Sequence, residues 1–302
     1  MTLHSFQPEL YHPTFANRPP ALHIKPGDSV TLSLPDAHGY DPHGIRLADF
    51  SNPLAGPIFV NDAYPGDTIS ITLDEIQPAS DNGWSYLFPT SNTIEAALFA
   101  ILPTDRQMVS WEIIRERAIA RPGKPFEDLK GLEIPVAPMV GCLGVAPSLS
   151  QAITSYSSGS FGGNMDCPLL TAGTRIELPV YVEGGLLYIG DCHAAQSHGE
   201  ITGAAIEIPA IVRFTVFVKK NTVIAWPRGE TDDSIFTIGC GRPLDTALQR
   251  ATSEMLHWLM LDFGMKPEIA ALKAGQCVRY VISNIVNEVS TIACTLSKTF
   301  LP

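Results

Sequence analysis

Two segments in the first third of the chain share one pattern of polar and apolar residues. In each, a Pro-Gly-Asp turn (residues 26–28 and 65–67) precedes six residues in which polar and apolar side chains alternate, Ser29–Leu34 and Thr68–Leu73. Proline fixes φ and glycine permits the left-handed backbone of a tight turn. Alternation with a period of two places the apolar side chains on one face of a strand. Both segments are therefore predicted to be half-buried antiparallel β-strands.

Apolar, β-branched and aromatic runs predict further strands. They lie at Trp84–Phe88, Leu186–Ile189, Arg213–Lys219 and Thr222–Trp226. The last two runs are joined by a short polar segment, which predicts a hairpin.

Helical periodicity is concentrated in the C-terminal quarter of the chain. Apolar residues keep a helical spacing over Thr246–Leu261, and Asp245 is the expected N-cap. Pro267 is expected to open a second helix, with Glu268 near the positive end of its dipole. The residues after Gly275 fit either a helix or a strand.

Composition supports a mainly β fold of the sandwich or barrel type with C-terminal helices. The 302 residues include 24 glycines and 25 prolines, which break helix interiors, and 45% are hydrophobic, enough for a sizeable core. The best candidate for a boundary is the short segment Pro122–Pro125. We expect two closely packed parts, an N-terminal β-rich part (residues 1–122) and a second β part that carries the C-terminal helices (residues 123–302).

Charge and hydropathy narrow the range of partners. The 20 Lys and Arg against 31 Asp and Glu give a formal net charge of −11, which disfavours a nucleic-acid partner. The longest apolar run, Ala96–Leu102, is far shorter than the ~20 residues of a membrane helix, and the N-terminus lacks a signal-peptide pattern. The six scattered cysteines form no Cys-x-x-Cys pair and are expected to be free thiols. We therefore expect a cytoplasmic protein without a membrane partner.

Glycines and polar residues are densest between residues 159 and 207. Asp191 and His193 follow the apolar run that ends at residue 189, so a continued strand would project both to one side and Cys192 to the other. A carboxylate and an imidazole at this spacing suit a cation of the zinc type. Asp166 is the expected third ligand, from a neighbouring loop.

Three protein ligands would leave a position for water, which bound zinc makes acidic enough to supply hydroxide near neutral pH. The hydroxide would attack an amide or ester carbonyl, with Glu200 as general base and then as proton donor to the leaving amine. Asn164 or the backbone N–H groups of residues 162–163 would stabilise the oxyanion. The alternative interpretation is that Asp191 and His193 only form hydrogen bonds with loop backbone.

Several motifs of this segment follow one another in an order that is typical of one family. They are Gly-Gly-Asn-Met-Asp (162–166), Gly-Asp-Cys-His-Ala-Ala-Gln (190–196), Gly-Glu (199–200) and Gly-Ala-Ala-Ile-Glu (203–207). In these residues the chain resembles the acetamidase/formamidase family, and similar pieces extend from about Pro26 to Leu272. The resemblance implies a mainly β fold with an additional α/β portion. It also implies a metal-dependent hydrolase of small amides that forms a homo-oligomer, most simply a dimer.

The resemblance assigns site residues by motif position. The implied metal ligands are Asp166, Asp191 and His193, and the implied catalytic groups around them are Asn164, Glu200 and Glu207. Asp36 falls near a family Asp-Ala pair and is a further candidate ligand. The alternative for Asp36 is a polar surface loop over residues 36–43.

Three departures from the family pattern concern the same site. Phe161 stands where the family commonly has His, residues 197–198 replace Gly-Asp, and residues 275–287 lack acidic positions of the family's C-terminal pattern. These changes remove either one metal ligand or a second cation site, calcium for example. We therefore expect this chain to share the fold of the family more closely than its activity.

The sequence thus predicts a metal-dependent amidohydrolase, with zinc as the expected metal, that cleaves a small linear or cyclic amide. One alternative is a catalytically altered family member that binds a small molecule, and another is a metal-dependent lyase or decarboxylase. A cysteine nucleophile is disfavoured because neighbouring strand residues such as Cys192 and His193 face opposite sides.

Overall fold

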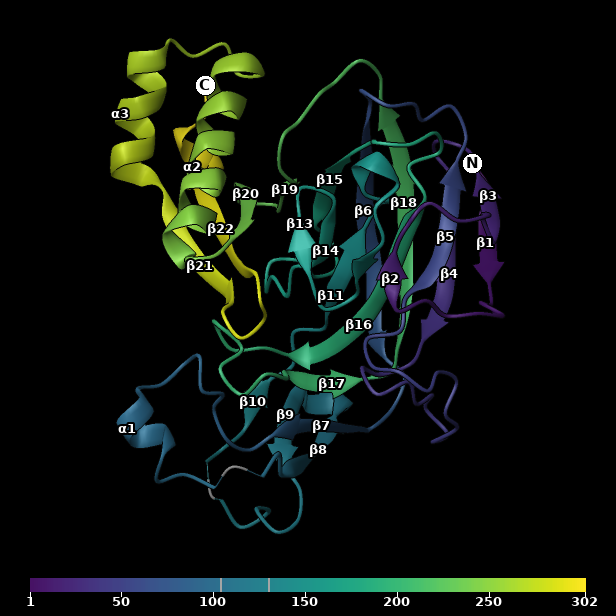
Figure 1. The fold of residues 1–302 in the computed structure, drawn as a ribbon, viewed down its shortest axis with the longest axis vertical. Coiled ribbons are helices and arrows are strands. Elements are labelled where there is room, and N and C mark those ends of the chain that lie inside the picture. Colours follow the sequence, from purple (N-terminus) through teal and green to yellow (C-terminus); the bar gives the residue numbers. More distant parts are fainter. Residues whose placement is uncertain (104, 130) are drawn as a thin grey trace.

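Two large β-sheets make up most of the molecule (Figure 1). The computed structural model describes residues 1–103, 105–129 and 131–302. Within these residues the nine-stranded sheet has the order β1 (Leu3–Phe6), β4 (Ser29–Leu34), β18 (Ala210–Lys219), β6 (Thr68–Pro78), β15 (Arg175–Pro179), β19 (Arg228–Glu230), β20 (Ser234–Gly241), β22 (Ser290–Ser297) and β21 (Arg279–Asn284).

The second sheet carries the segment with the densest polar motifs. In the described residues it has eleven strands, of which nine follow the order β10 (Ile134–Pro135), β9 (Ile119–Pro122), β8 (Met108–Ile114), β7 (Asn82–Tyr86), β17 (Ile206–Ile208), β16 (Leu187–Ala195), β11 (Met139–Gly144), β14 (Gly162–Asn164) and β13 (Ser158–Gly159). The other two are β5 (Ala55–Val60), which pairs with β16, and β3 (Leu22–Ile24), which pairs with β5. A separate pair is formed by β2 (Thr14–Phe15) and β12 (Ile153–Thr154).

Helices are few in the described part of the chain. They are α1 (Ala96–Phe99), α2 (Leu244–Leu261) and α3 (Pro267–Cys277), with short 3₁₀ turns η1 (Arg115–Arg117), η2 (Ser148–Ser150) and η3 (Lys298–Phe300). The predicted mainly β fold with C-terminal helices is confirmed. None of these helices has the length and apolar character that a membrane crossing requires.

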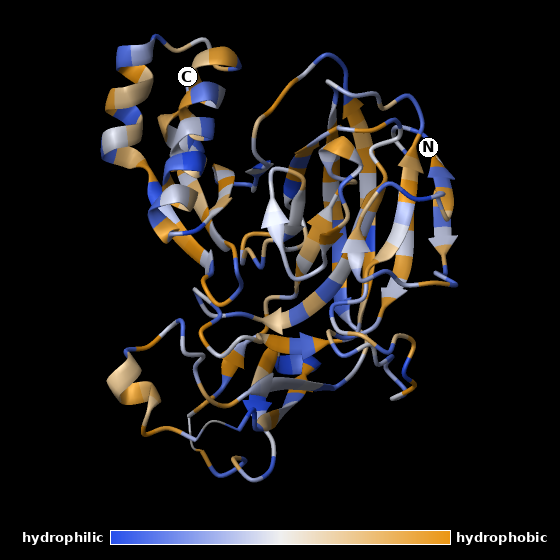
Figure 2. Cartoon of the chain, in the orientation of Figure 1, coloured by the Kyte–Doolittle hydropathy of each residue, from blue (hydrophilic) through white to orange (hydrophobic). Residues whose placement is uncertain are grey.

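The main hydrophobic core takes side chains from both large sheets. Along β4 and β6 the buried side chains are Val30, Leu32, Leu34, Ile69, Ile71 and Leu73. Figure 2 shows the resulting alternation of hydrophobic and hydrophilic residues along the strands of this sheet. Because β16 is buried along its whole length, the central strand of the second sheet is shielded from bulk water.

The C-terminal helices pack on β20 and β22 over a second hydrophobic core, at the upper left of Figure 1. Gly239 on β20 lets α2 approach, because a Cβ there would collide with the backbone of Ala247 and Ala251. The Nε atom of Arg228 on β19 lies 2.6 Å from Oε1 of Glu254 on α2, and both side chains are at most 2% exposed. This buried ion pair ties the helix to the sheet.

Most of the strand and helix predictions are confirmed. Ser29–Leu34 is β4, which pairs antiparallel with β18 and, on its other edge, parallel with β1. Thr68–Leu73 begins β6, which pairs antiparallel with β18 and β15, but it is more than half-buried, because Thr68 and Ser70 are buried as well as the apolar residues. Pro267 occupies the first turn of α3. The residues after Gly275, which fit either a helix or a strand, complete α3 and then form β21 and β22. All six cysteines are free.

Two local predictions are wrong. Thr222–Trp226 is an irregular segment, and β18 pairs with β4 and β6 instead of forming a hairpin with it. Pro227, which has no N–H for a ladder bond, follows that segment directly. The N-cap of α2 is Pro243, whose extended backbone starts the helix earlier, so that Asp245 lies inside the first turn. Strands from both sides of residue 122 occur in both large sheets, and the division into two parts at that residue stays a prediction.

Candidate metal centre

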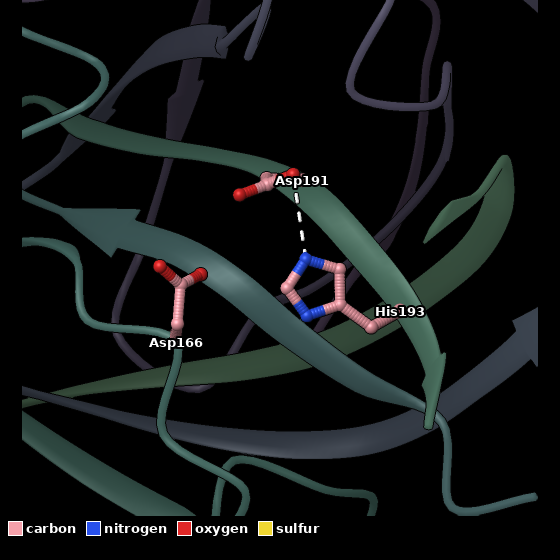
Figure 3. Close-up of side chains that lie close together, drawn as sticks. All are labelled: Asp166, Asp191 and His193. Carbon is pink, nitrogen blue, oxygen red and sulfur yellow. Dashed lines mark ion pairs between the residues drawn. The ribbon is translucent and has the colours of Figure 1, made fainter. Parts of the chain in front are cut away.

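The side chains singled out between residues 159 and 207 converge at the end of β16. Asp166, Asp191 and His193 each offer a ligand atom, and these atoms all lie within 4.8 Å of one another. Figure 3 shows Asp191 and His193 on β16, with Asp166 facing them from a neighbouring loop. The structure thus brings together the three predicted ligands, and their role as ligands stays a prediction.

A second group shares the histidine. His193, Glu200 and Glu207 also offer atoms within 4.8 Å of one another. Nε2 of His193 lies 3.5 Å from Oδ1 of Asp191 and 3.3 Å from Oε2 of Glu207. All five side chains are buried. The imidazole therefore stands between the carboxylates of both groups.

The backbone at this site is held in an uncommon conformation. The φ angles are 41° at Asp166, 58° at Asp191 and 52° at Glu200, all in the left-handed region that side chains other than glycine rarely adopt. Such strain persists only where the surrounding structure enforces it, and it gathers at functional sites. The left-handed residue interrupts the regular alternation of β16, yet Cys192 still packs in the core and His193 in the site, as predicted.

Gly141 on β11 makes the room for two of the carboxylates. A Cβ at this position would lie 2.6 Å from Oδ1 of Asp166 and 2.9 Å from Oδ2 of Asp191. These distances are shorter than real Cβ contacts, so any other residue would displace a carboxylate. The glycine is therefore part of the cradle.

Three polar atoms in this cradle lack a hydrogen-bond partner among the described residues. They are Oδ1 of Asp166, Nε2 of His193 and Oε2 of Glu207. Buried polar atoms in folded proteins nearly always have a partner, and an exception can mark a missing ion. A nitrogen and several carboxylate oxygens form the donor set that zinc-type cations accept. The residues therefore fit a divalent metal.

Gln196 fixes the orientation and the tautomer of His193. Its Nε2 donates to the backbone oxygens of Asp166, at 2.6 Å, and Ser283, at 3.0 Å. Its Oε1, 3.0 Å from Nδ1 of His193, must then accept from Nδ1–H. With Nδ1–H held by Gln196, loss of the Nε2 proton on binding a cation would leave the Nε2 lone pair directed at the site, which is the form of histidine that binds metals.

Asn284, at the end of β21, joins two of the acidic residues. Its Nδ2 lies 2.6 Å from Oδ2 of Asp166 and 2.8 Å from Oε2 of Glu200 and donates to both. Its Oδ1 accepts from the backbone N–H groups of residues 286 and 287. The sequence analysis missed this residue, because nothing local in the C-terminal stretch shows which of its polar side chains turns towards β16.

Asn164, a predicted oxyanion donor, is oriented by two neighbours. Its Oδ1 accepts from the thiol of Cys142, at 2.6 Å, and lies 3.5 Å from Nδ2 of Asn52. Asn52 also donates to Oδ2 of Asp191, at 3.3 Å. The Oδ1 atom of Asn164 is therefore engaged, and the residue lines the cavity at the cluster.

Burial governs the protonation of the cluster. It raises the pKa of Asp166 to about 7, and the Asp191 carboxylate adds to this rise. It also raises the pKa of Glu207 to about 7, and the pKa of Glu200 is raised by burial and by Asp166. Burial lowers the pKa of His193, but Glu207 and Asp191 raise it well above the ordinary value. These raised pKa values reflect a shortage of positive charge around four buried acidic groups and one imidazole, which a bound cation would relieve.

Asp36 is not brought into either group. One oxygen accepts from the backbone N–H groups of His38 and Tyr40, and the other accepts from Nε1 of Trp84, each at 2.9 Å. The prediction of Asp36 as a ligand thus has no support in the geometry, because both oxygens are already engaged in orienting a loop and a tryptophan.

Two other residues that the sequence singled out lie in the core. The side chain of Phe161 is 4% exposed and packs against Phe15, and the loss of a metal ligand through this departure stays a prediction. Cys192 lies in the core as well, and burial raises its thiol pKa, which is contrary to what a nucleophile needs.

A cavity of about 280 Å³ opens onto the cluster. Its inner end is formed by Asn164, Asp191, Glu200 and Glu207. The rest of the lining combines aromatic, polar and basic side chains and includes His38, Trp84, Tyr86, Thr90, Arg106 and Tyr156. A small molecule in this cavity would touch both sets of side chains.

Comparison with known proteins adds a family to this geometry. The chain is 27% identical over 256 residues to a formamidase of Methylophilus methylotrophus, an alignment that covers 66% of this chain and 61% of that protein. It is 26% identical over 291 residues to an acetamidase of Mycolicibacterium smegmatis, covering 78% of this chain and 70% of the relative. The chain therefore spans only about three fifths of the length of the Methylophilus protein.

A solved structure of an acetamidase is also similar to this chain. The crystal structure of an acetamidase from Yersinia enterocolitica superposes with a TM-score of 0.87 at 30% identity, over 99% of this chain and 93% of the other. The family model described as the Acetamidase/Formamidase family matches residues 7–157 and 150–259. On these matches, the chain belongs to the acetamidase/formamidase family.

Proposed function

We propose that this protein is a metal-dependent amidohydrolase that cleaves the C–N bond of a small linear or cyclic amide, other than a peptide bond. The observation that carries the proposal is the buried cluster of four carboxylates and one imidazole, with unpartnered atoms on Asp166, His193 and Glu207, at the end of a cavity. Membership of a family with relatives named formamidase and acetamidase supports the reaction class.

In this proposal Asp166, Asp191 and His193 hold the metal, most simply zinc. A bound zinc-type cation polarises the amide carbonyl and lowers the pKa of water. The protein side chains around it then bind the substrate and move protons.

Glu200 and Glu207 both line the cavity, and burial raises the pKa of both carboxyls, that of Glu207 to about 7, within the range of a general acid–base group. Glu200 is assigned to take the proton of the attacking water and to deliver it to the leaving nitrogen. Oε2 of Glu207 lies 3.3 Å from Nε2 of His193, so this carboxylate borders the same cation site. Nδ2 of Asn164 is assigned to donate to the carbonyl oxygen as negative charge develops on it.

The test combines elemental analysis with an amidase assay. Purified protein is expected to contain metal in a fixed ratio to protein and to release ammonia from small amides, with activity lost on chelation and regained on adding zinc. A metal-free protein that remains inert after reconstitution with divalent cations would contradict the proposal. The homo-oligomer implied by the family resemblance is a separate proposal, which light scattering on the purified protein would test.

A further inference from the structure

The outer part of the cavity contains a cation that the proposed hydrolysis does not use. Arg106 precedes β8 and lines the cavity. Among the described residues, no carboxylate oxygen lies within 4.0 Å of its guanidinium nitrogens, whereas other arginines such as Arg115, Arg121 and Arg228 are paired. Arg106 is exposed, and its guanidinium keeps N–H donors for an anion in the cavity that it lines.

Two contacts hold this guanidinium at the cavity wall. Its carbon lies 4.2 Å from the ring centroid of Tyr86, which is a cation–π contact. On another side it lies against Gly203, where a Cβ would come within 3.0 Å of Nη2 of Arg106. Gly203 has a φ of 75°, so both its backbone and its lack of a side chain suit this close approach.

The aromatic residues behind the guanidinium are themselves fixed. The hydroxyl of Tyr86 lies 3.1 Å from Nε2 of His38, and the ring of His38 stacks on Trp84 with centroids 3.9 Å apart. Nε1 of Trp84 donates to the buried Asp36. Asp36 therefore has a role in the cavity, as the anchor of the wall on which Arg106 rests.

Charge separates the two parts of the cavity. Arg106 is the one arginine or lysine among its described lining residues, whereas Asp191, Glu200 and Glu207 lie at the cluster. Burial lowers the pKa of His38, with Arg106 adding to that effect, so this ring stays neutral near pH 7. The cationic part thus carries a single formal charge, which matches a carboxylate better than a doubly charged phosphate.

We propose that the substrate is an amide that also carries a carboxylate, with its amide group at the metal cluster and its carboxylate paired with Arg106. The inference deepens the proposed function and rests on it. A guanidinium binds carboxylates through two parallel hydrogen bonds. A volume of about 280 Å³, near the lower end of small-molecule sites, suits such a compact two-headed molecule and leaves formamide loosely held.

The reaction of such a substrate balances without a further reactant. Water adds its oxygen to the amide carbonyl, the C–N bond breaks and ammonia leaves with the proton that Glu200 delivers. Succinamate, for example, would give succinate and ammonium.

The experiment compares charged and neutral amides of matched length in the zinc-loaded protein. Ammonia release is measured with malonamate and succinamate and with the neutral propanamide and butanamide. We expect the wild type to have the higher kcat/KM for the charged member of at least one pair. Arg106→Gln is expected to lower the charged-to-neutral ratio of kcat/KM about tenfold to a hundredfold, mainly through KM, and Arg106→Lys is expected to lower it less.

Arg46→Gln is the matched control, because Arg46 rests on Tyr40 outside the cavity lining. It should leave the ratio unchanged. A wild type that prefers the neutral amides, or an Arg106→Gln protein that keeps the wild-type ratio, would overturn the inference while leaving the amidase proposal intact.

Binding measurements keep the inference testable if no amide is hydrolysed. Calorimetry with succinamate on the zinc-loaded wild type and on Arg106→Gln then decides it. Binding that is lost in the variant supports the carboxylate site although the proposed function has failed, and an absence of binding to the wild type rejects both.

Discussion

Replacing Asp166 by Asn is expected to stabilise the metal-free protein while it weakens metal binding. The carboxyl of Asp166 is 1% exposed, and its Oδ1 has no partner among the described residues. Its Oδ2 accepts from Asn284, a bond that the carbonyl oxygen of an Asn side chain can keep. The new amide N–H₂ would take the place of Oδ1 and could donate to the neighbouring Asp191 carboxylate. The substitution thus exchanges a repulsion for a hydrogen bond.

The size of the gain follows from the raised pKa. Burial, with Asp191, raises the pKa of Asp166 from 3.8 to about 7, so the fold retains a proton that the unfolded chain has already released. The stability that this protonated group contributes is complete below about pH 4 and falls as pH rises to about 7. Roughly two pKa units of that range lie above pH 5. The advantage of Asn over Asp should therefore grow by up to ~3 kcal/mol between pH 5 and pH 8.

Urea denaturation in the presence of a chelator, at pH 5 and at pH 8, measures this gain. Asp232→Asn, a change at an exposed carboxylate, is the control and should alter the stability by no more than about 0.5 kcal/mol at either pH. With zinc at a hundred times its Kd, the wild type should gain about 2.7 kcal/mol, and Asp166→Asn should gain much less. The reasoning is refuted if the variant is no more stable than the wild type at pH 8, or if its gain is the same at both pH values.

Three further predictions concern the same cluster and its support. Asp191→Ala should lose metal and activity together, whereas Glu200→Gln should keep its metal and lose about 10²–10⁴-fold in kcat. Elemental analysis measures the metal and ammonia release measures the activity. Activity retained in both variants would contradict the assignments. Gln196→Leu should weaken zinc binding about 10–100-fold in a chelator competition, since nothing then accepts from Nδ1 of His193. An affinity equal to that of the wild type would exclude the positioning role. Glu254→Ala should lower the free energy of unfolding by up to about 3–5 kcal/mol, because it leaves the buried Arg228 with Asp262, which is 38% exposed, as its one carboxylate partner among the described residues. A loss below about 1 kcal/mol by urea denaturation would show that Asp262 or water replaces the lost partner.

The strands that the sequence predicts well are those whose own side chains carry the signal. In β4 and β6, alternation places Val30, Leu32, Ile69 and Ile71 in the core, and no distant residue has to be known for that inference. Thr222–Trp226 shows the limit of the same reasoning. Its composition favours a strand, but both edges of β18 are already paired, with β4 and with β6. Whether an apolar run becomes a strand depends on a free edge, which the local sequence does not show.

The candidate ligands could be predicted because the residue types and their spacing on one strand carry chemical information. Their neighbours could not be. Gly141 leaves room for two carboxylates, Gln196 orients His193, and Asn284 bridges two acidic residues. Each of these effects exists only when distant segments of the chain meet. Arg106 illustrates the same point. It is an exposed loop residue, and its place beside Tyr86 and Gly203 at the cavity is visible only in the folded chain.

The C-terminal elements α2, β21 and β22 connect the stability of the fold to the geometry of the site. Asn284 and the backbone oxygen of Ser283 come from β21, at the edge of the nine-stranded sheet, yet they contact Asp166, Glu200 and Gln196. β21 is held by β22, and α2 packs on β22 and β20. If α2 loosens, β21 loses its support and Asn284 no longer bridges Asp166 and Glu200. Repulsion between these two carboxylates would then open the site. It follows that metal should stabilise the C-terminal helices although they contribute none of the candidate ligands, since a cation at the cluster removes the repulsion that pushes β21 away.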